Sequence, residues 1–97
     1  SCVSAACEVL PPNLTKLHCR DVKVTARGMQ KIATLPLDSL TLNNCQITNQ
    51  MLSLLAPLKL QHLNISQNGV TAKGIRSILH MPLRTLEHDK IPILKVL

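Results

Sequence analysis

The sequence predicts an α/β solenoid, and three observations support this fold class. Leucines recur at a fixed interval of 23 residues, at Leu14, Leu37, Leu60 and Leu83. Each opens a segment whose apolar residues alternate as in a half-buried strand, and three of these segments are followed by apolar residues at helical spacing. Self-similarity at 20 to 50 residues indicates stacked units, each of which buries its apolar face only against its neighbours.

The expected strands share one register. Laid over one another, the segments are LTKLHCRDVKVT, LDSLTLNNCQIT, LQHLNISQNGVT and LRTLEHDKIPIL. In LxxLxL the last two apolar residues are two apart and point to the same side of a strand, while the residues between them face outward. The inward columns are Leu17, Leu40, Leu63 and Leu86, then Cys19, Leu42, Ile65 and His88. Because His88 is polar, we expect the fourth unit to be degenerate.

The column after the strand carries a second signal, with Val22, Cys45, Asn68 and Ile91. The full pattern resembles the LxxLxLxx(N/C)xL signature of the leucine-rich repeat family, and the ribonuclease-inhibitor-like or cysteine-containing subtypes most closely. In that family an asparagine or cysteine at this column satisfies backbone groups of the turn. Asn68 and Cys45 match the signature, whereas Val22 and Ile91 depart from it. The resemblance implies a right-handed solenoid with a parallel β-sheet on its concave face and short helices on its convex face.

The second half of each unit predicts a short helix. Thr25, Thr48 and Thr71 stand where a hydroxyl can cap the first helical N–H groups. The segments that follow, residues 26–35, 49–58 and 72–81, carry apolar residues at helical spacing. Prolines close the helices, at Pro36, Pro57 and Pro82.

The spacing divides the chain into one domain, residues 1–97, with repeats at 14–36, 37–59 and 60–82 and a degenerate last repeat at 83–97. Val9 and Leu10 lie three periods before Ile78 and Leu79. Residues 1–13 are therefore expected to be the helical half of a preceding repeat, or else an N-terminal cap. We accordingly expect a fragment of a longer array; the alternative is a small domain whose irregular ends are its caps. Uncapped ends would also permit end-to-end association into a larger assembly.

The cysteines give information on the cellular compartment of the protein. The repeat places Cys19 in the core and Cys45 in the turn column, where both are expected to be thiols. Cys2 and Cys7 either pair in the cap of a secreted protein or are free thiols of an earlier helix. The sequons at Asn13 and Asn64 point to secretion, but a glycan on the strand residue Asn64 would obstruct the sheet. We expect an intracellular, reducing compartment, with secretion as the alternative.

Outward-facing strand residues are the candidate partner-binding site. Neighbouring parallel strands lie about 4.8 Å apart, so these side chains form one patch that is basic at one end and acidic at the other. The resemblance implies that a partner protein binds there, which makes the chain a scaffold or interaction module. The candidate residues on this concave face are Lys16, His18, Arg20, Asn43, His62, Asn64, Glu87 and Asp89.

The net charge of +6 supports an alternative. Four basic residues of the expected helices can bind nucleic acid or another anionic partner on the convex face: Arg27, Lys31, Lys73 and Arg76. The chain has no Phe, Tyr or Trp, so it lacks stacking platforms for bases, and this function ranks second.

Catalysis is the third class, and the sequence argues against it. His18 and Cys19 are adjacent on a strand and face opposite sides, so they cannot act as a nucleophile and base pair. Neither a zinc-binding spacing nor a glycine-rich phosphate loop is found, so no catalytic residue, metal site or cofactor is predicted. No apolar run is long enough for a membrane span.

Overall fold

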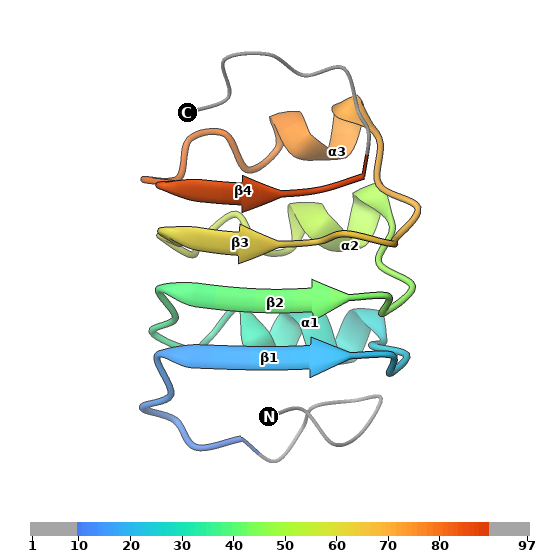
Figure 1. The fold of residues 1–97 in the computed structure, drawn as a ribbon. Coiled ribbons are helices and arrows are strands. Elements are labelled where there is room, and N and C mark those ends of the chain that lie inside the picture. The colour runs from blue at the N-terminus through green and yellow to red at the C-terminus, as the bar shows by residue number, and fades with distance from the viewer. Residues whose placement is uncertain (1–9, 90–97) are drawn as a thin grey trace.

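The computed structural model describes residues 10–89, which form a four-stranded parallel sheet with three short helices on one side (Figure 1). The strands are neighbours in chain order. The elements are β1 Lys16–Arg20, α1 Ala26–Ile32, β2 Ser39–Asn43, α2 Asn49–Ser53, β3 His62–Asn64, α3 Ala72–Arg76 and β4 Thr85–Glu87. An α/β repeat architecture is thus confirmed.

The strands pair in the register that the sequence columns predict. Lys16 lies opposite Ser39, Ser39 opposite His62, and His62 opposite Thr85. The two residues of each pair are 23 positions apart in the sequence, as Lys16 and Ser39 are, which is the period of the repeat. Residues of one sequence column therefore lie side by side across the sheet.

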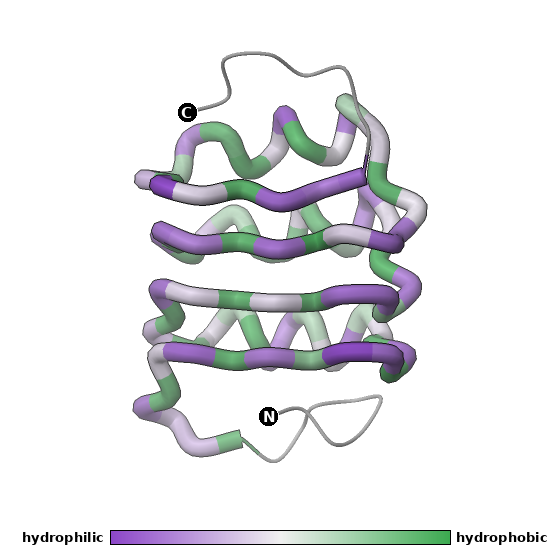
Figure 2. The backbone as a smooth tube through the Cα atoms, in the orientation of Figure 1, coloured by the Kyte–Doolittle hydropathy of each residue, from purple (hydrophilic) through white to green (hydrophobic). Residues whose placement is uncertain are grey.

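The core lies between the sheet and the helices. Leu17, Leu40 and Leu63 are at most 2% exposed, and they pack in one cluster with helix residues such as Met29 and Ile75. Figure 2 shows the corresponding alternation of apolar and polar residues along the strands. Within residues 10–89 no helix covers the opposite face of the sheet, which we call the exposed sheet face. It corresponds to the predicted concave face.

The helices are shorter than the predicted segments 26–35, 49–58 and 72–81. They end at Ile32, Ser53 and Arg76, so the prediction was wrong for the last residues of each segment. Tight i→i+3 bonds replace helical ones there, as in Leu35 N–H to Ile32 O at 3.1 Å and Leu58 N–H to Leu55 O at 2.9 Å. Such bonds satisfy orphan carbonyls while turning the chain back toward the next strand.

Two of the three predicted threonine caps are confirmed. Thr25 Oγ1 accepts from Gly28 N–H, and Thr48 Oγ1 accepts from Met51 N–H, both at 3.1 Å. Thr71 has no side-chain cap bond, and that prediction was wrong. Its hydroxyl accepts instead from Asn49 Nδ2 at 2.8 Å, while Asn49 Oδ1 accepts from Thr71 N–H at 2.9 Å. Asn49 therefore ties α2 to the beginning of α3.

Asn68 fills the turn column as predicted. Its Oδ1 accepts from Cys45 N–H at 2.9 Å and from Ile47 N–H at 3.0 Å. Its Nδ2 lies within 2.7 Å of Leu42 O and 2.8 Å of Ile65 O, and Ser66 O is 3.2 Å away. One side chain thus bonds the turns of two successive units.

Cys45 reproduces part of this pattern with a thiol. Its Sγ donates to Cys19 O at 3.4 Å or to Asn43 O at 3.3 Å. These two carbonyls lie one unit before those of Leu42 and Ser66, which accept from Asn68. Burial raises the pKa of the Cys45 thiol, the Val22 backbone N–H lowers it, and the nearby charge of Asp21 adds to the increase. Cys19 and Cys45 are both buried, as predicted.

Several predictions concern residues beyond the described range. These are residues 1–9 of the helical half or cap predicted at 1–13, residues 90–97 of the degenerate last repeat, and the positions of Cys2, Cys7 and Ile91. His88, the polar residue of the core column, lies one position after β4 and is half-buried.

Candidate functional site

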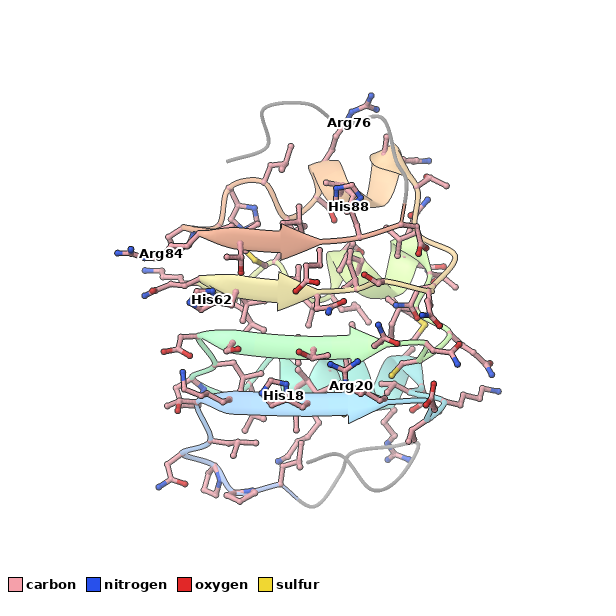
Figure 3. The ribbon with its side chains drawn as sticks, viewed as in Figure 1. His18, Arg20, His62, Arg76, Arg84 and His88 are labelled. Carbon is pink, nitrogen blue, oxygen red and sulfur yellow. The ribbon has the colours of Figure 1, made fainter. Side chains whose placement is uncertain are left out.

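The exposed sheet face contains a shallow hollow of about 290 Å³. Side chains from all four strands meet there, because residues of one column stand next to one another across the sheet. Five of the eight predicted partner-binding residues line it: His18, Arg20, His62, Asn64 and Glu87. Figure 3 views this face with His18, Arg20 and His62 labelled.

Two histidines on this face are each hydrogen-bonded to a threonine of the next strand. His18 Nδ1 lies 2.9 Å from Thr41 Oγ1, and His62 Nδ1 lies 2.9 Å from Thr85 Oγ1. Thr41 is only 7% exposed although it points away from the core. Both bonds use Nδ1, so Nε2 of each ring is left for a partner. We did not select Thr41 and Thr85 from the sequence, although they share a column with the histidines they bond.

Arg20 and Glu87 are the charged residues that line the hollow. Arg20 ends β1, Glu87 ends β4, and both side chains are exposed. Within residues 10–89 neither belongs to an ion pair. Between them lie uncharged hydrogen-bonding groups, including Asn64, whose Oδ1 accepts from Ser66 N–H at 3.0 Å. The hollow is therefore positive on the first strand and negative on the last.

Lys16, Asn43 and Asp89 do not line the hollow. Lys16 Nζ forms an exposed ion pair with Asp38 Oδ1 at 3.1 Å. The carboxylate of Asp89 accepts from the backbone N–H of Gln67 at 2.6 Å and of Asn68 at 3.3 Å, so it supports the turn after β3. Asn43, at the end of β2, is half-buried.

The basic residues of the alternative site are exposed but divided between two helices. Arg27 and Lys31 belong to α1, whereas Lys73 and Arg76 belong to α3. Between these helices packs α2, whose sequence NQMLS carries no charge. A second shallow hollow, of about 380 Å³, involves only Lys73 among the four. The basic surface of the convex side is thus two separate pairs.

The described residues offer little support for metal binding or cysteine catalysis. Between residues 10 and 89, no three His, Cys, Asp or Glu side chains are grouped so that they can hold a metal ion. Burial raises the pKa of Cys45, which disfavours the thiolate form that a cysteine nucleophile needs. Among the helices of this described part, none has the length and apolar character of a membrane span.

Comparison with known families identifies the repeat. Residues 57–79, which include β3 and α3, match the family model described as "Leucine Rich repeat". Searches of curated proteins and of solved structures give no match. Domains of this family generally mediate protein–protein interaction and are generally non-catalytic. The match supports a leucine-rich repeat at residues 57–79, and the other units share the sequence columns of that segment.

Proposed function

We propose that this chain is a non-catalytic interaction module or scaffold that binds a partner protein through the exposed sheet face. The observation that carries the proposal is the hollow on that face, where five predicted residues from three strands converge. A sheet anchored by a buried core is preorganised, so a partner loses little affinity to ordering of the site. The candidate contacts remain those predicted from the sequence, with Thr41 and Thr85 positioning the histidine rings.

The composition of the face indicates how a partner would be recognised. Interfaces usually gain affinity from buried aromatic anchors, and this chain has none. Charge complementarity and hydrogen bonds then determine the choice of partner, and rim charges act mainly on the association rate. We therefore expect a moderate affinity that decreases with added salt.

Binding of nucleic acid or another anionic partner by the basic helices is the second candidate. All four basic residues are exposed, which favours it. The uncharged α2 separates them into two pairs, which weakens the case for a continuous phosphate-binding surface. This function predicts binding that falls steeply between 50 and 200 mM salt, since counterions are released from the nucleic acid.

The test is a charge-reversal comparison in which the two faces are altered separately. One variant carries Arg20→Glu and Glu87→Lys, which leaves the net charge unchanged, and the comparison variant carries Arg27→Glu and Lys73→Glu, which lowers the net charge by four. All four positions are exposed, so the circular dichroism of both variants should equal that of the wild type. Proteins captured from the source cell are then identified by mass spectrometry.

We expect the sheet-face variant to lose the partners that the wild type captures, while the helix variant keeps them. The opposite pattern, with an unchanged partner set for the sheet-face variant and a lost one for the helix variant, refutes the proposal. Binding of a labelled 20-base-pair DNA duplex, measured by anisotropy at 50 and 200 mM salt, tests the second candidate directly.

Finer features of the fold and setting are part of the same proposal. We expect right-handed winding, because crossovers between parallel strands are right-handed in nearly all sheets. We also propose repeat boundaries at 14–36, 37–59 and 60–82. The proposed subtype is ribonuclease-inhibitor-like or cysteine-containing. An intracellular compartment is supported by the free thiol of Cys45, and end-to-end assembly remains part of the proposal.

A further inference from the structure

We propose that the ligand of the exposed sheet face is an extended peptide segment with one acidic and one basic side chain, spaced four residues apart. The acidic side chain would pair with Arg20 and the basic one with Glu87. This inference rests on the proposed function and specifies the partner's chemistry.

The charges on the face reduce to two. Lys16 and Asp89 do not line the hollow: Lys16 forms an exposed ion pair with Asp38, and the carboxylate of Asp89 accepts from backbone N–H groups of the turn after β3. Arg20 and Glu87 line the hollow and, among the described residues, have no ion-pair partner. A ligand that satisfies both must itself carry two opposite charges.

Strand geometry sets the distance between those charges. Glu87 lies in register with Asn64 on β3, and Asn64 is in register with Thr41, which pairs with His18. Three strand spacings separate β1 from β4, about 14 Å, and Arg20 is two residues further along, about 7 Å. The diagonal is about 16 Å, and an extended chain advances about 3.4 Å per residue. Side chains alternate between the two faces of an extended chain, so charged side chains four positions apart, about 14 Å, face the same way and match the two sites.

The groups between the charges favour an extended backbone. Nε2 of His18, Nε2 of His62 and Nδ2 of Asn64 have no protein hydrogen bond among the described residues. An extended peptide presents N–H and C=O groups that still need partners, whereas a helix satisfies its own backbone groups internally. The shallow hollow thus offers hydrogen bonds where an extended segment requires them.

The probe is a displayed library of random ten-residue peptides, selected against the complete 97-residue chain. We expect enrichment of an acidic residue and a basic residue separated by four positions, in either chain direction. Selected peptides should bind Arg20→Glu at least tenfold more weakly than the wild type. Replacing the acidic peptide residue with lysine should restore their binding to that variant.

The charge preferences at Arg20 and Glu87 can be reversed independently of each other. Selection against Glu87→Lys should convert the basic position of the consensus to an acidic one and leave the position opposite Arg20 unchanged. Arg27→Glu on α1 changes the net charge of the chain by the same amount as Arg20→Glu and should leave the consensus unaltered. A consensus without a charge pair, or one that Arg20→Glu and Glu87→Lys do not alter, overturns the inference.

A second copy of the chain is the main competing occupant, because a two-fold axis could place Arg20 of one copy against Glu87 of another. Light scattering tests for this dimer. If the wild type is a dimer and either Arg20→Glu or Glu87→Lys makes it a monomer, the face serves self-association and the peptide inference is overturned. The proposed function is tested separately. Charge reversal on the sheet face could abolish binding of whole partner proteins while no peptide with a charge pair is selected. In that case the face recognises a folded surface instead of an extended peptide, and the proposed interaction function stands.

Discussion

Replacing Asn68 with leucine should remove the bonds that join two turns. The amide can make four hydrogen bonds, two at Oδ1 and two at Nδ2, and the structure offers five backbone partners for them. A typical net contribution is about 1 kcal/mol per bond. Since Asn68 is half-buried, some freed groups reach water, and we expect a loss of about 3 kcal/mol.

That loss is large for a chain of this size. A domain of 97 residues has a free energy of unfolding of about 5 to 15 kcal/mol. With a urea dependence of about 1 kcal/mol per molar, the unfolding midpoint of Asn68→Leu should fall by about 3 M. Urea titrations monitored by far-ultraviolet circular dichroism measure this shift.

Two further variants make the test specific. Asn68→Cys introduces the residue found one unit earlier, so it should lose only about half as much as leucine, because a thiol retains one donor and one acceptor. Asn13→Leu, in an exposed turn, should change stability by less than about 0.5 kcal/mol. A midpoint for Asn68→Leu within 0.5 M of the wild type, at unchanged slope, would falsify the assignment of this side chain to the turn bonds.

Other predictions concern the thiol, the helix junction and the caps. The pKa of the Cys45 thiol is raised in the fold, so below its unfolded value of about 8.5 both states hold the proton and stability is unaffected. Above that pH the unfolded state loses the proton first, and the free energy of unfolding falls by up to about 1.4 kcal/mol per pH unit. In urea titrations from pH 7 to 10, the Cys45→Asn variant should therefore lose less stability than the wild type. A Cβ at Gly74 would clash with Asn49 Oδ1 and would meet Asn49 Cα at 3.2 Å, so Gly74→Ala should destabilise the wild type more than it destabilises an Asn49→Ala background, and an additive double-mutant cycle refutes this. Thr25→Ala should cost about 1 kcal/mol and Thr71→Ala less than half of that, because only the first hydroxyl caps a helix; equal urea midpoints contradict the distinction.

The sequence columns predicted strand order, register and buried faces because one repeat constrains all its copies. Knowing that Leu17 faces the core places Leu40 and Leu63 beside it. The position of Thr41 in the hollow also follows from its column, once His18 is known to be its neighbour.

What the columns could not predict are contacts made by residues that differ between units. Asn49 has no equivalent amide in the other units, and it diverts Thr71 from the capping role that Thr25 and Thr48 perform. Asp89 looked like a free surface charge, but its carboxylate accepts bonds from a turn 21 and 22 residues earlier. These outcomes depend on side-chain geometry that a shared pattern does not contain.

The bonds of Asn68 also govern the order in which the chain would come apart. Because this side chain fastens its own turn to that of the preceding unit, the strand β3 cannot separate from β2 without losing those bonds. β4 pairs with β3 over three residues, whereas β1 and β2 pair over five. In a linear array held by nearest-neighbour contacts, β4 should separate from β3 more readily than β1 separates from β2, and this opening should stop at the Asn68 junction. Amide hydrogen exchange should then be fast at Glu87, the acidic end of the hollow, and slow at Leu42.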